Sequence, residues 1–243
     1  MRSSADSVHL QALLDAAALS VADGCRPLSS DLVHKLKVLM DSIQPEHLGL
    51  QQAVVSQGNV KDSTVIRTQI VYETEGFELC IFKFPRGVRL PLHDHPKMTV
   101  FSKVLYGALA MQSYDWDDPL IAEELAAIDA ATESQQGGKA DVTQVQRPVT
   151  QRADTILTPE APTFCLQPSF ANIHCFEALS ECAVLDLLLP PYDDDAGRAC
   201  HYFEAVDWSD ARKLELILSE PLPGTLNIQG EPYRGPKLHP RRA

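Results

Sequence analysis

The chain of 243 residues carries 33 acidic and 21 basic side chains, for a formal net charge of −12, and 44% of its residues are hydrophobic. This length allows one sizeable hydrophobic core, so we predict a single domain with additions. The acidic balance excludes a phosphate-binding surface, so we expect no nucleic acid as a partner. No long apolar span or signal-type segment occurs, so we expect no membrane as a partner either. We expect a soluble protein of the cytoplasm, with the nucleus left open.

Residues 1–50 predict a helical addition to the domain. Apolar side chains recur at helical spacing over 7–22, and a second periodic run extends from Leu32 to Ile43. Ser29 precedes this second run, where a serine side chain can cap a helix. We expect both helices to pack on the outside of the domain. The histidines of this region are predicted to be surface residues and not metal ligands: His9, His34 and His47.

From residue 64 onward the pattern changes to short β-rich runs separated by Gly, Pro and acidic residues, which predicts strands. No helix of crossover length separates these runs, so an antiparallel barrel is favoured over a parallel sheet. We place this domain at residues 51–238. The predicted strands are 64–72, 77–84, 89–92, 98–105, 109–116, 149–153, 155–157, 163–166, 173–179 and 183–189, followed by Tyr202 with Phe203 and by the alternating Leu214, Leu216 and Leu218.

Three segments between or after the strands are predicted to be irregular. Residues 117–147 are rich in Ala, Gln and acidic side chains and predict a flexible insertion without function, with one short helix over 120–130. Pro190 and Pro191 remove two consecutive amide donors, so we predict a loop at the barrel mouth. Residues 222–243 are rich in Pro and Gly and are expected to wrap the barrel surface, with 239–243 as a tail beyond the domain.

Two histidines separated by one residue stand at the entrance to an apolar run. In an extended strand His93 and His95 point to the same face and can converge on one ion, while Asp94 points away. Such a pair alone is weak evidence, because two surface histidines give the same pattern. The third histidine, His174, opens a later apolar run. Two strands of one barrel bring these imidazoles together, which predicts a metal site of His93, His95 and His174.

The spacing of the glycines around the histidine pair indicates a fold class. Gly87 lies six residues before His93 and Gly107 twelve after His95. This spacing resembles the first cupin motif, so the fold class we expect is mainly β, a cupin-type double-stranded β-helix, or jelly-roll-like barrel, with N-terminal helices. Where that motif has a glutamate, this chain has Thr99 and Val100. Three neutral ligands leave a ferrous ion its full positive charge and open positions, which suits a thiolate co-ligand.

The six cysteines are predicted to be reduced. Four lie inside apolar runs, where free cysteine behaves as a small hydrophobic residue, and no CxxC pair supports a structural zinc site. They are Cys25, Cys80, Cys165, Cys175, Cys182 and Cys200.

Over residues 45–238 the chain resembles the thiol dioxygenases of the plant cysteine oxidase and cysteamine (2-aminoethanethiol) dioxygenase family. One departure is Ala171, where the family usually has glycine, and we expect it to be tolerated. The matching segments are Pro91-Leu-His-Asp-His-Pro, Met98-Thr-Val-Phe-Ser-Lys, Leu105-Tyr-Gly, Ser113-Tyr-Asp-Trp116, Asn172-Ile-His-Cys-Phe176, Cys182-Ala-Val-Leu-Asp-Leu, Pro190-Pro-Tyr192, Gly197-Arg198, Cys200-His-Tyr202 and Glu231-Pro-Tyr-Arg-Gly-Pro-Lys237.

The resemblance implies an iron(II)-dependent dioxygenase that adds both atoms of O2 to a thiol and gives a sulfinic acid. It places Asp186 and Tyr192 in the pocket, the carboxylate to orient a substrate ammonium and the phenol to donate a hydrogen bond to oxygen or sulfur. Asp186 interrupts an apolar strand, where an acid is costly without a partner. Cys200 and Tyr202 match positions that form a thioether crosslink in some cysteamine dioxygenases, although a buried thiol beside an aromatic ring explains them equally well.

The expected substrate is a peptide or protein that begins with cysteine, with cysteamine as a weaker or parallel substrate and O2 as co-substrate, acted on by a monomer. By resemblance this makes the enzyme an oxygen sensor. Free cysteine calls for a cation to bind its carboxylate, and Arg89 and Arg198 are the candidates near the motifs. Two alternatives stay open: a zinc or nickel cupin acting as an isomerase or hydrolase, since imidazole does not select iron, and a non-catalytic metal-bound sensor.

Overall fold

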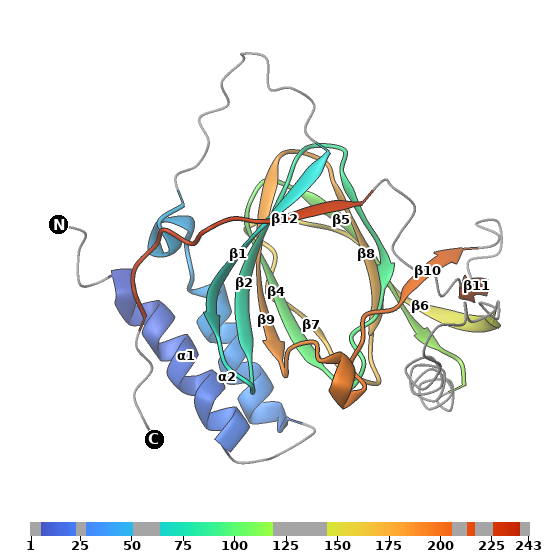
Figure 1. Ribbon diagram of the computed structural model, residues 1–243, viewed down its shortest axis with the longest axis horizontal. Helices are drawn as coiled ribbons and strands as arrows, with labels where there is room; N and C mark the ends of the chain where they lie inside the picture. Colours follow the sequence, from blue (N-terminus) through green and yellow to red (C-terminus); the bar gives the residue numbers. More distant parts are fainter. Residues whose placement is uncertain are drawn as a thin grey trace.

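The structure, a computed structural model, describes residues 6–22, 28–50, 64–118, 145–205, 213–216 and 226–238 (Figure 1). Its helices are α1 (Asp6–Ala22), α2 (Ser30–Asp41), η1 (Pro45–Leu48) and η2 (Asp194–Ala196). Its strands are β1 (Val65–Glu73), β2 (Glu78–Phe84), β3 (Arg89–His93), β4 (Thr99–Tyr106), β5 (Leu109–Trp116), β6 (Val145–Leu157), β7 (Phe164–Leu166), β8 (Ile173–Ala178), β9 (Cys182–Leu189), β10 (Tyr202–Ala205), β11 (Lys213–Leu216) and β12 (Asn227–Gly230).

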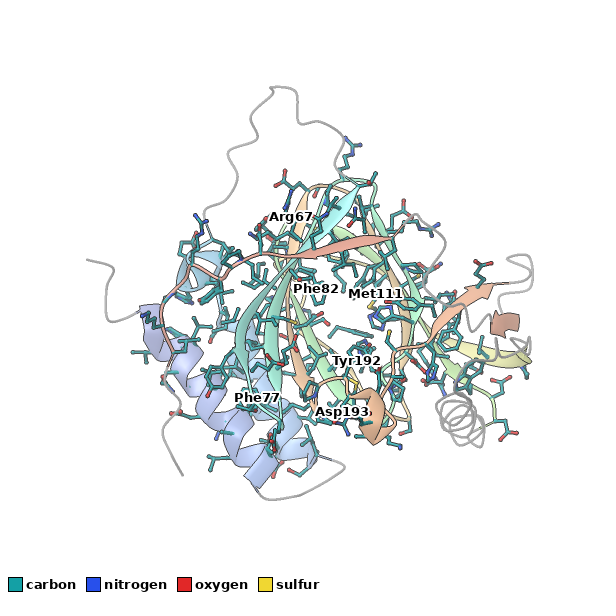
Figure 2. The ribbon with its side chains drawn as sticks, viewed as in Figure 1. Arg67, Phe77, Phe82, Met111, Tyr192 and Asp193 are labelled. Atoms are coloured by element: carbon teal, nitrogen blue, oxygen red, sulfur yellow. The ribbon has the colours of Figure 1, made fainter. Side chains whose placement is uncertain are left out.

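Two sheets form the body of the domain. One has the strand order β12-β1-β2-β9-β4-β7, and the other, β10-β11-β6-β5-β8-β3, closes on itself as a barrel. Their inner faces share one core, in which Phe84, Val104 and Val184 of the first sheet meet Met111 and Phe176 of the second. Figure 2 shows Phe82, Met111 and Tyr192 inside this enclosure. The expected mainly β architecture, a barrel with N-terminal helices, is confirmed.

Helices α1 and α2 cover the outer face of the first sheet, as predicted (Figure 1). The Ser29 side chain accepts a hydrogen bond from the Leu32 amide at 3.3 Å and caps α2. Leu13 of α1 and Leu36 of α2 are fully buried in one cluster with Leu187 of β9. Alternate side chains of β9 point to this cluster and to the interior, which explains why the strand is apolar almost throughout. Among the described helices, none combines the length and apolar character needed to cross a membrane.

The strand predictions need three corrections. The runs 149–153 and 155–157 are one strand, β6, because the intervening Asp154 pairs with Gln112 in the ladder to β5. The same strand starts at Val145, so the insertion predicted at 117–147 ends earlier. Its residues 119–144 lie outside the described part of the chain, as does Leu218. Finally, the pairing is not antiparallel throughout, because β12 runs parallel to β1.

The chain after residue 226 crosses the first sheet. β12, which the sequence did not predict, joins the edge of β1, and the Glu231 amide donates to the Thr68 carbonyl at 2.8 Å. Tyr233 and Leu238 then pack against the helical cluster. This segment therefore ties the barrel to the helices, in agreement with a tail that wraps the surface. The five described cysteines are free thiols, and Cys25 lies outside the described residues.

Candidate metal centre

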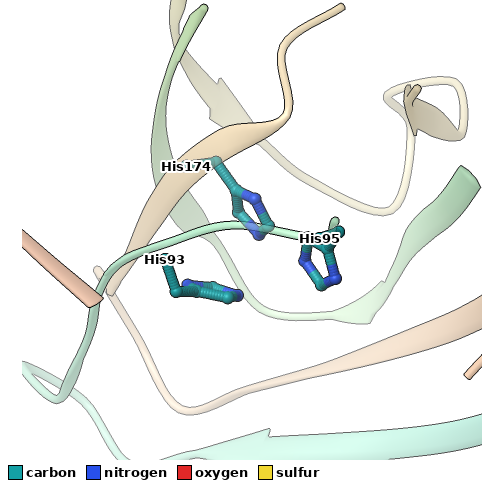
Figure 3. A group of neighbouring side chains, drawn as sticks. All are labelled: His93, His95 and His174. Atoms are coloured by element: carbon teal, nitrogen blue, oxygen red, sulfur yellow. The ribbon is translucent and has the colours of Figure 1, made fainter. Parts of the chain in front are cut away.

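The structure brings together the three histidines that the sequence singles out (Figure 3). His93 ends β3 and lies opposite His174 in β8, and His95 follows two residues later in the turn after β3. Their nitrogens lie within 4.8 Å of one another and all three residues are buried. The strand ends at His93, earlier than the two-residue repeat assumed, yet the rings still converge, with 5.0 Å between the centroids of His93 and His95.

The histidine cluster is electrically neutral in the absence of a ligand. Burial lowers the pKa of His93, and burial together with the neighbouring imidazoles lowers the pKa values of His95 and His174 well below the usual value. Neutral imidazole presents a lone pair to a cation, whereas protonated imidazole has none. The Nε2 atom of His95 and the Nδ1 atom of His174 are buried without a hydrogen-bond partner. The donor set therefore fits a divalent metal bound by nitrogen.

Hydrogen bonds behind the rings orient two of the lone pairs. His93 Nδ1 lies 2.9 Å from the Pro91 carbonyl, which only accepts, so Nδ1 carries the hydrogen and Nε2 the lone pair. The Tyr192 hydroxyl donates to the Asp94 carbonyl at 2.7 Å and lies 2.7 Å from His95 Nδ1. Because the single phenol proton goes to the carbonyl, His95 Nδ1–H donates to Tyr192 and its Nε2 is left for a metal.

This arrangement changes the expectation for Tyr192. The sequence placed its hydroxyl where it would donate to oxygen or sulfur, but here the proton is held by the Asp94 carbonyl. Burial also raises the pKa of Tyr192 well above its usual value, so the phenol stays protonated. Its ring stacks on His95 with centroids 5.1 Å apart. Tyr192 therefore fixes the orientation of His95.

Asn172 has a structural role at this site. In the sequence it stands out only as the first residue of a family motif. Its Oδ1 accepts from the His95 amide at 3.0 Å, and its Nδ2 donates to the His95 carbonyl at 2.9 Å. The backbone amide of Asn172 donates a hydrogen bond to Asp115 Oδ1. One side chain thus clamps the turn that carries His95 to the strand that carries His174. The signal available in the sequence is an amide residue two positions before a candidate ligand.

Asp94 points away from the three histidines, as predicted, and has a partner that the sequence did not indicate. Its carboxylate accepts from the backbone amide of His201 at 2.9 Å and from His201 Nδ1 at 2.9 Å. Both residues are buried. The contact joins the histidine turn to the segment with Cys200 and Tyr202, so one carboxylate holds two parts of the site in register.

Cys200 and Tyr202 lie beside the metal centre. Tyr202 pairs with His93 across β10 and β3, and their ring centroids are 6.1 Å apart. The Cys200 thiol interacts with the hydroxyls of both Tyr202 and Tyr192, and burial raises its pKa to about 12. Cys200 precedes β10, so it does not lie on the same strand as Tyr202. The thiol instead lies between two phenols.

Asp186 lies on the inner face of β9, opposite Cys80 of β2 and Ser102 of β4. Burial raises the pKa of its carboxyl to about 7, and Ser102, which hydrogen-bonds it, opposes that rise. The Oδ1 atom is buried without a hydrogen-bond partner. Cys80 packs in one cluster with Tyr192, so this wall of the barrel faces the His95 side of the centre. An unmatched buried carboxylate there fits a cationic group of a ligand.

Neither arginine near the motifs supplies a cation to this pocket. Arg89 is paired with Glu177 at 3.2 Å on the outer surface, and its side chain is 60% exposed. Arg198 donates to the Pro191 carbonyl and to Asp193 within the loop after β9. Both guanidinium groups are therefore engaged elsewhere.

Comparison with known proteins places the chain in a family. A model of the PCO_ADO family matches residues 39–238. The chain is 33% identical to plant cysteine oxidase 2 of Arabidopsis thaliana over 201 residues, which are 80% of this chain and 65% of that protein. It is 29% identical to 2-aminoethanethiol dioxygenase of Homo sapiens over 218 residues, 85% of this chain and 81% of that protein.

A solved RmlC-like cupin protein from Desulfovibrio desulfuricans is 17% identical, with a TM-score of 0.33, and covers 58% of this chain and 98% of its own. The chain thus spans just under two thirds of the plant relative and about four fifths of the human one. The match to the family model includes all three histidines and both sheets. The chain belongs to the thiol dioxygenase family of plant cysteine oxidases and 2-aminoethanethiol dioxygenases.

Proposed function

We propose that this protein is an iron(II)-dependent dioxygenase that converts a thiol and O2 into a sulfinic acid, R–SH + O2 → R–SO2H. The observation that carries the proposal is the buried, neutral cluster of His93, His95 and His174, with two ring nitrogens that have no protein partner. Both oxygen atoms of the sulfinic group come from O2 and the thiol proton is retained in the acid, so no further reductant is needed.

His93, His95 and His174 would hold the ion. Iron(II) bound there supplies open coordination positions for a thiolate and the capacity to activate O2. Tyr192 and Asn172 do not take part in the reaction directly. Tyr192 keeps the His95 ring in the tautomer that presents Nε2 to the metal, and Asn172 holds the backbone of His95 in place. Zinc or nickel at the same imidazoles would give a different class of reaction, so metal identity has to be measured.

The charges of the pocket support a substrate with an amine and no neighbouring carboxylate. A substrate ammonium beside Asp186 would match its unpartnered oxygen and relieve the cost of the buried acid. The carboxylate of free cysteine would find no partner in Arg89 or Arg198, because both guanidinium groups are engaged elsewhere. We therefore propose that the substrate is a Cys-initiated peptide or protein, with cysteamine weaker or parallel. The acidic N-terminus produced would be a signal that degradation machinery can read, which makes the reaction an oxygen sensor.

The deciding assay offers equimolar cysteine, cysteamine and a Cys-initiated peptide to protein reconstituted anaerobically with iron. After O2 is admitted, mass spectrometry follows the gain of two oxygen atoms on each thiol. We expect the peptide to be oxidised fastest and free cysteine slowest. Matched zinc-loaded protein serves as the control and should be inactive. Rapid oxidation of free cysteine with an inert peptide would overturn the substrate assignment and leave the thiol dioxygenase chemistry.

The environment of Cys200 supports a covalent link to a neighbouring phenol during turnover. A thioether bond between Cys200 and Tyr202 releases two hydrogens, for which O2 is the oxidant. Intact-mass analysis after turnover tests it, and an unchanged mass would remove the crosslink. Because the thiol also contacts Tyr192, Tyr202→Phe would show which phenol is used.

A further inference from the structure

A row of carboxylates lies on the inner face of the six-stranded sheet, across β1, β2 and β9. Glu73 of β1 pairs with Glu78 of β2, and Cys80, one step further along the same face of β2, pairs with Asp186. Glu73 is exposed, Glu78 is partly buried and Asp186 is 9% exposed. The row therefore begins in solvent at Glu73 and ends at Asp186, on the side of the metal centre.

Glu78 occupies the inner face and has no described cation as a partner. Its register partner Leu188 packs in the interior cluster with Cys80 and Tyr192, and residues directly opposite in a ladder point to the same side. Its carboxylate interacts with the Cys80 thiol and is repelled by Glu73, and burial raises its pKa. The described lysine of the same strand, Lys83, points to the other face and pairs with Glu231.

Two further observations indicate that this wall is built to receive a ligand. The buried Oδ1 atom of Asp186 has no hydrogen-bond partner, so a buried acceptor at the inner end of the row is left unsatisfied. On the same face, Ile70 of β1 lies opposite Cys80 and is 50% exposed. The wall is therefore open to solvent at β1, where an extended chain can enter beside an apolar side chain.

Asp186 and Glu78 are diagonal neighbours, because Asp186 of β9 pairs with Cys80 and Glu78 lies two residues before Cys80 on β2. Diagonal side chains across a ladder stand about 7–8 Å apart, and the first two Cα atoms of a bound peptide are about 3.8 Å apart, so a long second side chain can span the remainder. If the first residue has its thiol at the histidines and its ammonium at Asp186, the side chain of the second residue can extend to Glu78. This step rests on the proposed function.

We propose that Glu78 determines substrate specificity by binding a basic side chain at the second position of a Cys-initiated peptide, and that it rejects an acidic one. The preference arises from binding, since residue two does not take part in the chemistry. It should therefore appear in KM and leave kcat nearly unchanged. Charge also gives it a salt dependence, because the mouth of the barrel is partly exposed to solvent.

The test compares two peptides that differ only at position two, Cys-Lys and Cys-Glu, on the iron-loaded full-length protein. We expect kcat/KM to favour Cys-Lys by about tenfold, since one peptide is attracted and the other repelled. Glu78→Gln should reduce the ratio to below about threefold, and Glu78→Lys should invert it. The matched control is Glu181→Gln, which removes one exposed charge at the other end of β9 and should leave the ratio unchanged.

Anaerobic calorimetry with the same two peptides measures the preference without turnover and uses the wild-type protein alone. A preference that disappears at about 0.5 M salt, where screening is strong, supports the inference. Equal affinities for both peptides, or a preference that Glu78→Gln leaves intact, would overturn it while the dioxygenase function stands. Absence of oxidation for every thiol, with the binding preference present, would instead refute the proposed function and leave the role of Glu78 in place.

Discussion

The two faces of β9 differ in how far their side chains find partners within the chain. On the outer face Leu185 and Leu187 are fully buried against the helices, and each finds an apolar partner within the chain. On the inner face Val184 and Leu188 flank Asp186, whose Oδ1 has no hydrogen-bond partner. One face is thus completed by folding, and the other is left incomplete until a ligand arrives.

The unsatisfied atoms of the interior come from several strands. Besides Asp186 Oδ1 they include His95 Nε2, His174 Nδ1 and Ser113 Oγ. Ser113 is fully buried in β5 opposite His174. Buried polar groups without partners cost stability, about 1–3 kcal/mol each. Their concentration in the interior between the two sheets indicates that the chain gives up stability there in exchange for binding capacity.

Removing one histidine of the interior should abolish metal binding. His174→Ala takes away one of three candidate ligands and is expected to abolish metal retention, because the two imidazoles that remain, at the end of β3 and in the turn after it, do not enclose an ion. The measurement is metal content after anaerobic reconstitution and gel filtration, alongside thiol oxidation. His34→Ala, on an exposed position of α2, is the control and should retain metal. Full metal occupancy in His174→Ala would contradict the assignment of the site.

Truncating the outer face should affect stability instead. Leu187→Ala removes a fully buried side chain between sheet and helices, and we expect the free energy of unfolding to fall by about 3 kcal/mol. Urea denaturation of the metal-free protein measures it. Leu179→Ala, at a position that is 39% exposed, should cost far less. Protein that remains folded should still bind metal. A loss of metal affinity without a loss of stability would show that the two faces are not separable.

Asp186 links the comparison to pH. Its carboxyl pKa is raised to about 7 by burial, so between pH 4 and 7 the folded state holds a proton that the unfolded state has released. The contribution to stability is therefore present at low pH and is lost as the pH rises through 7. Asp186→Asn should remove this slope, and at pH 8 the free energy of unfolding of the metal-free variant should exceed that of the wild type by up to about 4 kcal/mol, because folding raises the pKa of the carboxyl from 3.8 to about 7.

Denaturation of both proteins at pH 5 and pH 8 gives the difference in slope. Thiol oxidation should fall in Asp186→Asn even though stability rises, because the neutral amide does not attract an ammonium. Parallel stability curves for the two proteins would mean that the carboxyl is not perturbed. Unchanged oxidation of an amine-bearing thiol would remove Asp186 from substrate binding.

Much of the metal centre follows from short-range patterns. The separation of His93 and His95 and the position of His174 at a strand entrance are visible in the sequence. Their convergence then follows once the chain forms a barrel with two facing sheets. The helices were equally accessible, because an apolar repeat and a capping serine at Ser29 are local signals.

What the sequence left out depends on contacts between distant segments. The pairing of Asp94 with His201 joins residues 107 positions apart, and the Asn172 clamp on His95 spans 77. The Tyr192 hydroxyl donates its proton to a backbone carbonyl, and no side-chain pattern in the sequence reveals such a contact. The short strand β12 has four exposed residues, so it carries no hydrophobic alternation. In each case the missing information is tertiary.

The smallest expected effect comes from Ala171, which directly precedes the Asn172 clamp. Ala171 has a φ of +55° and is fully buried in the cluster beside the centre. Ala171→Gly relieves left-handed strain of about 1 kcal/mol, but it loses a buried methyl and gains freedom in the unfolded chain, each of similar size. We expect unfolding free energies within about 1 kcal/mol of each other and unchanged metal affinity, since Asn172 keeps its contacts to His95 through its own side chain. Urea denaturation and metal titration check both. A metal affinity that changes while stability does not would show that the turn geometry at 171, and not only the Asn172 clamp, sets the position of the histidines.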